Sequence, residues 1–291
     1  MKNFLQRGEA SEKTVEITEE EWRMCSIMDD IFRVREVRMR LVLYNIRYGT
    51  GTGWNYHFPF PFSGCLRRTE GRFRRISEYV SKLNPDLVGL VEADSGSFRQ
   101  NGSCQARTLA SRIGGESVFA CKYDSGSIVS KTPLLKSQGN AVITKLPMVG
   151  TKEHVLSKGV KKTLLEVEFD EFTLFLTHLP LGYAARSVQL GEIAERCIDA
   201  KKPVILAGDG NTYGGERELR SFFRKTGFQN ANPTNMPTFP SRIPALALDF
   251  VLYGPGIEME RFDVPRVRYS DHLPLVCDFS VARPKKERRS R

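Results

Sequence analysis

Residues 203–211 read PVILAGDGN, a short apolar run that ends in an acid and an amide. A continuous apolar run of this length is typical of a β-strand whose two faces are both buried. Asp209 and Asn211 follow it at once, with Gly210 between them, where the backbone can come close to a ligand. Because a strand end holds side chains rigidly and still exposes them, this stretch predicts a functional loop.

Similar apolar runs recur along the chain and predict most of the fold. We expect strands over 40–45, 86–92, 140–146, 163–169, 172–178, 203–209, 247–253 and 273–279, and helices over 18–34, 69–83, 184–199 and 215–226. Strands that are apolar throughout need cover on both faces, and the close spacing of 163–169 and 172–178 indicates an antiparallel hairpin. The pattern favours an α/β fold in which two mixed β-sheets pack face to face with helices outside.

The composition indicates one main domain. The chain has 291 residues, 40% of them hydrophobic and 27% charged. We expect this domain over 39–282, an N-terminal extension over 1–38 and a basic C-terminal tail over 283–291. The sequence has no signal-peptide core and no run of about 18 apolar residues, so we expect a cytoplasmic protein without a transmembrane segment. The six cysteines lack CxxC spacing, which argues against a zinc site or a disulfide framework.

The charge balance indicates an anionic partner. The formal net charge is +10, and the last nine residues alone carry six Arg or Lys and one Glu. Such a surplus attracts nucleic acid, anionic lipid or a phosphorylated metabolite.

Polar residues lie at the ends of the other predicted strands as well. The set contains four carboxylates, two amides and two histidines: Asn45, Glu92, His178, Asp209, Asn211, Asp249, Asp271 and His272. Any one of them alone is more often a turn former, or a histidine that serves the structure. Their coincidence at equivalent places in one core predicts a site.

The chemistry of these residues favours a hard divalent cation and a phosphate. Carboxylate and amide oxygens are the ligands of Mg²⁺ or Mn²⁺, and we expect Glu92 to be the main ligand, helped by Asn45 and Asp271. A phosphate bound there needs an oriented water and donors to its oxygens, roles that suit Asp209 and Asn211. Asp249, at the start of a neighbouring strand, is the natural partner of His272.

The motifs together resemble the endonuclease/exonuclease/phosphatase superfamily, the DNase I-like metal-dependent phosphohydrolases. They occur in family order over roughly 40–280: YNIR, LVGLVEAD, GNAVITKLP, THLP, GDGN, PTFP before ALDFVLY, and SDHLPL. The resemblance implies a four-layered α/β sandwich and hydrolysis of a phosphoester by in-line attack of water. It implies metal roles for Asn45, Glu92 and Asp271, and catalytic roles for His178, Asp209, Asn211, Asp249 and His272. Asn140 and Arg186 are expected to bind substrate, although a charge on a helix surface explains Arg186 equally well.

Three departures from the family pattern stand out. Val91 replaces a Gln, which removes one supporting amide, and Gly210 replaces a large apolar residue, which predicts a looser loop. An insert over 49–64 carries several aromatic residues, among them Trp54 and Tyr56, which we expect to contact substrate. Its aromatic rings suit base stacking, a lipid interface or simple packing over the sandwich edge.

We therefore expect a monomeric, divalent-metal-dependent phosphodiesterase, with nucleic acid favoured over lipid as substrate because the chain is basic. Lipid and small-molecule phosphoesters remain open, because family members that act on them share these motifs. A non-catalytic binding protein on the same fold predicts gaps in the polar set, and the sequence has none. A serine or cysteine hydrolase is disfavoured, because the chain has no G-x-S-x-G motif.

Overall fold

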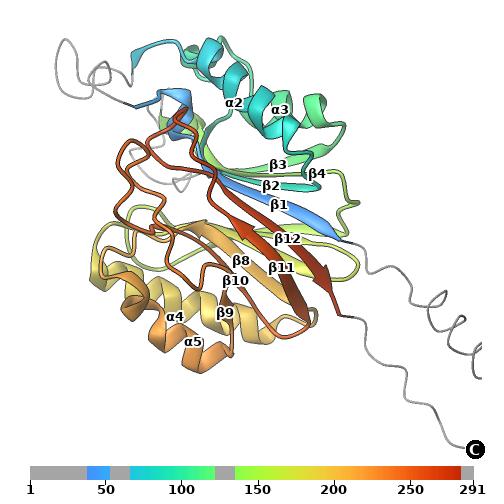
Figure 1. Cartoon of the computed structure of the whole chain (residues 1–291), viewed down its shortest axis with the longest axis vertical. Coiled ribbons are helices and arrows are strands. Elements are labelled where there is room, and N and C mark those ends of the chain that lie inside the picture. Colours follow the sequence, from blue (N-terminus) through green and yellow to red (C-terminus); the bar gives the residue numbers. More distant parts are fainter. Residues whose placement is uncertain (1–37, 53–65, 122–134, 283–291) are drawn as a thin grey trace, which may run out of the picture. The chain divides into compact units, whose positions relative to one another are not determined.

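A computed structural model of the protein describes residues 38–52, 66–121 and 135–282. These residues fall within one compact unit, Val37–Arg291, and build two six-stranded sheets (Figure 1). The first sheet has the order β11-β12-β1-β2-β4-β3 and the second β5-β6-β7-β8-β10-β9. Both are mixed, since β1 pairs parallel to β2 and β7 parallel to β8, whereas the other pairs are antiparallel.

The elements of the first sheet come from both halves of the described chain. Its strands are β1 (Met39–Asn45), β2 (Leu87–Asp94), β3 (Glu116–Cys121), β4 (Gln138–Thr144), β11 (Ile257–Asp263) and β12 (Leu275–Val281), and its helices are α2 (Glu70–Lys82) and α3 (Gln105–Ile113). The strands of the second are β5 (Gly150–Val155), β6 (Thr163–Glu168), β7 (Thr173–His178), β8 (Val204–Asp209), β9 (Gln229–Asn230) and β10 (Asp249–Tyr253), and its helices are α4 (Tyr183–Asp199) and α5 (Arg220–Thr226). Short 3-10 turns are η1 (Arg47–Gly49), η4 (Phe98–Gln100), η6 (Leu135–Ser137) and η7 (Gly215–Leu219).

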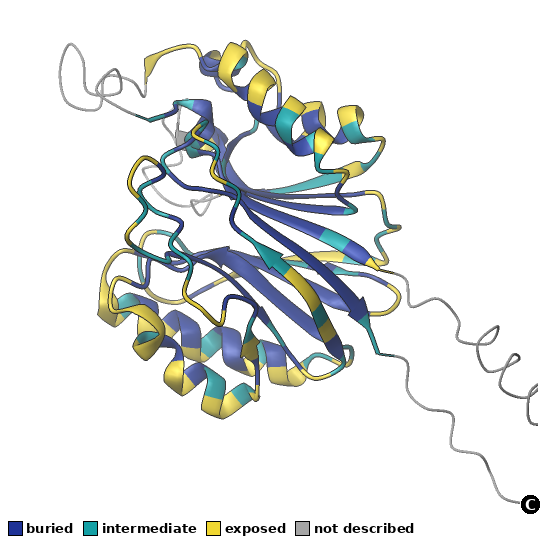
Figure 2. Ribbon diagram, in the orientation of Figure 1, coloured by how far each residue is buried: buried dark blue, intermediate teal, exposed yellow. Residues whose placement is uncertain are grey.

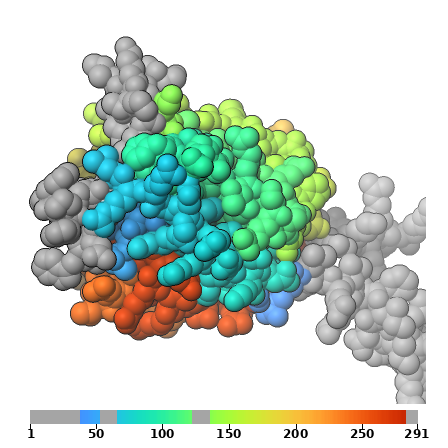
Figure 3. All heavy atoms as spheres, turned by 90° about the horizontal axis from the view of Figure 1, so that it is seen from above, coloured from blue at the N-terminus to red at the C-terminus, as the bar shows by residue number. Residues whose placement is uncertain are grey.

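Three hydrophobic clusters make this a four-layered sandwich, as predicted. Leu41 and Leu43 of β1 point into the cluster between the sheets, whereas Val42 and Tyr44 point into the cluster beneath α2. A third cluster lies between the second sheet and helices α4 and α5. The central strands are therefore buried on both faces, while the outer sides of the helices are exposed (Figure 2). Seen from above, α2, α3 and the segments around them cover the first sheet (Figure 3).

The predicted strands and helices that contact the core are confirmed to within a few residues, but four strands and one helix are additional. Strands β3, β5, β9 and β11 and helix α3 were not expected from the sequence. Each of these four strands lies at an edge of its sheet. An edge strand has exposed side chains, as in GTKEHV of β5, so it lacks the apolar run on which the prediction relied.

Several predictions lie outside the described residues. They include the helix over 18–34, the aromatic residues Trp54 and Tyr56 of the insert, and the basic tail over 283–291. Among the helices of the described ranges, none combines the length and the apolar character needed to cross a membrane.

Candidate active site

Three candidate residues lie side by side across the second sheet. The parallel register of β7 and β8 sets His178 opposite Asp209, and the antiparallel register of β8 and β10 sets Asp209 opposite Asp249. All three side chains are buried. Three neighbouring strands, hydrogen-bonded in a row, therefore bring one imidazole and two carboxylates side by side.

Asn45 and Glu92 come from the first sheet. Asn45 is the last residue of β1, as predicted, but Glu92 does not end its strand. Strand β2 continues to Asp94 and bulges between Leu90 and Ala93, and Glu92 there has a positive φ of 55°. A bulge changes the direction of the side chain at its extra residue. Because the bulge depends on how β2 pairs with β4, the local sequence does not predict it.

Asn140 of β4 lies opposite this bulge. Its Oδ1 accepts a hydrogen bond from the Glu92 backbone N–H at 3.4 Å, and its side chain is buried. The expectation that Asn140 contacts substrate stays a prediction, but its place in the fold makes it a support for Glu92.

Asp271 and His272 occupy the loop before β12, as their adjacency required. The Nδ1–H of His272 donates to Asp249 Oδ2 at 2.8 Å, which is the pairing expected from the sequence. Asp271 does not join this pair but contacts Arg47 of η1, with 3.1 Å between Arg47 Nη1 and Asp271 Oδ2. Arg47 also connects to Asn45, whose Oδ1 accepts from its backbone N–H at 3.1 Å.

Contacts between the two sheets close the site around Asp209. Asn45 Nδ2 donates to Asp209 Oδ2 at 2.9 Å. The same oxygen is 3.2 Å from His178 Nε2 and 3.9 Å from His272 Nε2. On the other side of its ring, His178 Nδ1 is 3.8 Å from Glu92 Oε1. Residues separated by up to 227 positions in sequence thus meet at one carboxylate, since Asn45 and His272 both approach Asp209.

His272 carries a positive charge at neutral pH. Burial alone would lower its pKa, but the carboxylates of Asp249, Asp209 and Asp271 outweigh burial and raise the pKa to about 10. Burial raises the pKa of Asp249, against the opposing charge of His272. Thr238 supports the pair, because its Oγ1–H donates to Asp249 Oδ2 at 2.6 Å. His272 is therefore a fixed donor that points its Nε2–H toward Asp209.

His178 is the opposite case. Burial and the nearby ammonium of Lys161 lower its pKa to about 4, although Asp209 and Glu92 oppose them, so its ring is neutral at pH 7. Burial also favours a neutral Asp209, but His178, His272 and Lys161 outweigh it and hold the pKa of that carboxyl well below its usual range. Asp209 is thus an anion in a buried position.

The loop after β8 is tighter than the sequence predicted. Gly210 donates its N–H to Leu248 O at 2.7 Å, and a Cβ at this position would lie 2.6 Å from the Phe250 ring. The expected looseness is therefore wrong, because the small residue permits close packing and leaves no slack. Asn211 has a φ of 48° and donates from Nδ2 to Leu179 O at 2.8 Å, so one N–H of its amide braces the turn after His178.

Arg186 differs from both of its expected roles. It lies at the start of α4 but is buried, with only 2% of the residue exposed, which rules out a helix-surface charge. Its Nε and Nη2 bind Glu218 Oε2 at 2.7 and 2.6 Å, and its Nη1 donates to the carbonyls of Pro180 and Leu181 at 2.9 and 2.7 Å. These contacts make Arg186 a clamp between two loops, which does not fit a substrate-binding role.

The donor set suits a hard cation on the side of Glu92 and Asp271. Burial is the main cause of the raised pKa of Asp271, and the nearby Glu92 carboxylate adds to it. A bound cation would relieve this repulsion between like charges. Ligand atoms of Asp209, Asp249 and His272 also lie within 4.8 Å of one another. In that group the Nδ1–H of His272 already donates to Asp249 Oδ2, and its Nε2 lies 3.9 Å from Asp209 Oδ2. The structure therefore offers two groups of possible ligands, and the metal roles of Asn45, Glu92 and Asp271 stay a prediction.

Three residues at the site were not predicted: Arg47, Lys161 and Thr238. Arg47 and Thr238 lie within the YNIR and PTFP motifs, so the motifs could have drawn attention to them. Lys161 lies in a loop of lysines and glycine that carries no signal of function in the sequence.

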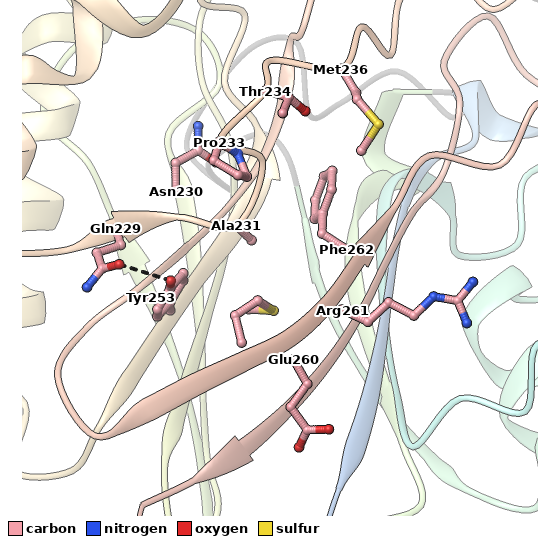
Figure 4. A pocket seen from close by; sticks show the side chains of 11 residues that line it. Gln229, Asn230, Ala231, Pro233, Thr234, Met236, Tyr253, Glu260, Arg261 and Phe262 are labelled. Atoms are coloured by element: carbon pink, nitrogen blue, oxygen red, sulfur yellow. Dashed lines mark hydrogen bonds between the residues drawn. The ribbon is translucent and has the colours of Figure 1, made fainter.

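A cavity elsewhere in the molecule contains none of the candidate residues. It has a volume of about 480 Å³ and opens between β10 and β11, with Tyr253, Met236 and Phe262 among its lining residues (Figure 4). Tyr253 is at the opposite end of β10 from Asp249. The cavity is therefore remote from the site.

The model of one protein family covers most of the chain. The model of the endonuclease/exonuclease/phosphatase family matches residues 42–272. The chain belongs to this family. The match spans every residue of the site described above, from Asn45 to His272, and family members are in general hydrolases of phosphoesters that typically depend on a divalent metal.

Individual relatives of this endonuclease/exonuclease/phosphatase family protein are distant. A UPF0294 protein from Erwinia tasmaniensis is 29% identical over 176 residues, which cover 60% of this chain and 56% of that protein. The chain thus matches little more than half the length of that relative. The structure of a family member from Beutenbergia cavernae matches with a TM-score of 0.63 at 20% identity. The match covers 84% of this chain and 72% of the Beutenbergia chain. The human nocturnin catalytic domain with a bound sulfate anion matches with a TM-score of 0.62 at 21% identity. This match covers 84% of this chain and 95% of the nocturnin chain. These likenesses establish the DNase I-like fold.

Proposed function

We propose that the protein is a divalent-metal-dependent phosphodiesterase in which Asp209 aligns the attacking water. The observation that carries the proposal is the meeting of both sheets at Asp209, where Asn45, His178 and His272 all approach one carboxylate oxygen. A non-catalytic protein has no need of a buried anion held between two histidines, because burial of charge is costly.

The charge states suggest a role for each side chain. Asp209 is anionic, so it accepts a hydrogen bond from the attacking water and aligns it for in-line attack, and the proton that the water loses reaches the leaving-group oxygen through solvent. His272 is cationic and bound to Asp249, so it donates to a phosphoryl oxygen while the bond to the leaving group breaks. Neutral His178 and the amide of Asn211 are further hydrogen-bonding groups at the same place.

The metal belongs on the side of Glu92, Asn45 and Asp271 in this proposal. A divalent cation held there supplies charge for the phosphate oxygens. The bulge in β2 orients Glu92 toward that position, and Asn140 supports it through the Glu92 backbone N–H.

Nucleic acid is the substrate that we favour. The net charge of +10 suits a polyanion, and Arg47 and Lys161 add cations within the site itself. We also propose that the protein acts as a monomer in the cytoplasm.

A lipid or other phosphoester with an apolar group is the second candidate, because apolar side chains rim the site. Leu181 and Tyr183 follow His178 and are 62% and 65% exposed, and Tyr213 follows Asn211 and is 49% exposed. The clamp of Arg186 on Glu218 and on the carbonyl of Leu181 ties these two loops together. Exposed apolar groups beside a basic site also suit a lipid surface.

Parallel incubations with supercoiled plasmid and with phosphatidylcholine vesicles, each in Mg²⁺, separate the candidates. Nicking that is lost with EDTA and in Asp209→Asn, but kept in the half-exposed control Asp263→Asn, supports the nuclease. Release of lipid headgroup without nicking selects the second candidate. If neither substrate nor a small model diester is hydrolysed, the phosphodiesterase proposal is wrong.

A further inference from the structure

Helices α2 and α3 lie side by side on the outer face of the first sheet (Figure 1), and a cavity opens between them. Its volume is about 310 Å³, which is within the range of ligand pockets. Side chains of α2, of η4 and of α3 line it, and the described residues of this lining include none of the candidate active-site residues. The α2–α3 cavity is therefore a place of its own at which a ligand can bind.

Two buried polar atoms in this lining have no hydrogen-bond partner within the part of the chain that the structure describes. One is Oγ of Ser77, a fully buried residue of α2, and the other is Oε1 of Glu70, the first residue of α2. Arg68 Nη1 lies 3.7 Å from this carboxylate oxygen, which is too far for a hydrogen bond. A buried polar atom without a partner costs free energy, and a bound molecule can supply the missing bond.

Two arginines bring positive charge to the same cavity from its two helical walls, Arg74 from α2 and Arg112 from α3. Both residues are exposed, and neither forms an ion pair with a carboxylate of the described residues. Glu70 is the one acidic residue in the described lining, so the two guanidinium groups exceed the carboxylates by one charge. This balance favours an anionic ligand.

A phosphate ester that also carries hydrogen-bond donors satisfies both sets of groups. Guanidinium groups hold phosphate oxygens through pairs of N–H donors. The Glu70 carboxylate only accepts hydrogen bonds, so it needs a hydroxyl or amino group of the ligand, whereas the Ser77 hydroxyl can donate or accept. A bare anion would leave Glu70 without a partner and be repelled by it. Phosphate, hydroxyl and amino groups together are the chemistry of a nucleotide.

We propose that the α2–α3 cavity binds a nucleotide, with its phosphate between Arg74 and Arg112 and its hydroxyl or amino groups on Glu70 and Ser77. The nucleotide is either a free one or one unit of a nucleic-acid strand, which present the same groups. This inference goes beyond the proposed phosphodiesterase activity and does not depend on it.

The test measures the binding of adenosine 5′-monophosphate by calorimetry, in EDTA so that no metal-dependent hydrolysis occurs. Because each variant loses hydrogen bonds to a charged group, the Kd should rise at least about tenfold in Arg74→Ala and in Arg112→Ala. Arg75→Ala and Arg107→Ala are the matched controls and should resemble the wild type. They remove the same charge from the same two helices at exposed positions outside the described lining. Any binding at the candidate active site is common to all five proteins.

Two substitutions inside the cavity separate a binding role from a structural one. Ser77→Ala removes a hydroxyl that has no partner, so it should weaken the binding of adenosine 5′-monophosphate but not lower the free energy of unfolding. Glu70→Gln should weaken the same ligand but tighten the binding of inorganic phosphate, because the repulsion between like charges is gone. A Ser77→Ala protein that is less stable but binds as the wild type does would assign the hydroxyl to the fold.

A short single-stranded oligoadenylate without terminal phosphates identifies the source of the nucleotide. If Arg74→Ala and Arg112→Ala bind this strand more weakly than their controls do, the cavity holds one unit of a nucleic acid. If they lose only adenosine 5′-monophosphate, the ligand is a free nucleotide. If the wild type binds neither probe, or if these two variants bind both probes as their controls do, the proposal is wrong.

Discussion

At His272, three carboxylates determine the charge of one buried ring. The raised pKa of about 10 means that the folded protein binds this proton more tightly than the unfolded chain does. The stabilisation is therefore complete below the unfolded pKa of about 6.5 and is lost as the pH rises through about 10.

We expect the His272 ring signals in NMR to stay those of an imidazolium from pH 6 to 9. Asp249→Asn should lower this pKa, since the variant loses the carboxylate that accepts from Nδ1. The free energy of unfolding of the wild type, relative to His272→Gln, should decrease between pH 7 and 10. A ring that titrates near its ordinary pKa in the wild type would show that the pair is not charged.

Glu92 is the residue on which the metal prediction depends most. Glu92→Gln keeps the shape of the side chain but removes its charge, so the Mg²⁺ concentration for half-maximal activity should rise at least about tenfold. Glu116→Gln, on the exposed edge strand β3, is the matched control. An unchanged Mg²⁺ requirement in Glu92→Gln would place the ion at another set of ligands.

Most of these site residues were predictable because each follows an apolar run within a motif. Two kinds of information were not available in the sequence. The bulge at Glu92 depends on the register between β2 and β4, and the contact of Lys161 depends on how a distant hairpin folds back on α4. Burial of Arg186 was likewise hidden, since its partner Glu218 lies on another element.

At the scale of the elements, the turn after β8 has little room for a larger side chain. Gly210→Ala places a Cβ 2.6 Å from the Phe250 ring, so urea unfolding should show a loss of about 1–3 kcal/mol. Gly71→Ala in α2 is the control, because its Cβ would meet nothing within 4 Å, and it should be neutral or stabilise by up to about 1 kcal/mol. An unchanged free energy of unfolding in Gly210→Ala would support the looser loop that the sequence predicts.

The start of α4 is joined to η7 by the buried pair of Arg186 and Glu218. Arg186→Met leaves the Glu218 carboxylate buried without its partner, which should cost about 3–5 kcal/mol of stability. The double variant with Glu218→Gln should recover part of the loss in the same urea experiment. A double variant less stable than Arg186→Met would show that the unpaired Glu218 charge is not the cause of the loss.

The edge strands show why the sequence predicts an element only in part. Strands β1, β2, β7 and β8 have cover on both faces and are apolar throughout, whereas β5 and β11 are half exposed and mix charged with apolar residues. A half-exposed strand can be recognised only when the strand that it pairs with is known.

At the scale of the molecule, the function depends on the packing of one sheet on the other. Asn45 and Glu92 belong to the first sheet and His178, Asp209 and Asp249 to the second, so neither sheet contains the site by itself. The family match over residues 42–272 includes strands of both sheets, as expected if the site needs both.

The most direct test of the account is the hydrolysis of a small phosphodiester in Mg²⁺ by the wild type and by Asp209→Asn, with the melting temperature of each. Asp209 lies where the sheets meet, so we predict a loss of at least about 10²-fold in kcat at nearly unchanged melting temperature, with EDTA abolishing the wild-type rate. A folded Asp209→Asn that keeps most of its kcat would contradict the account.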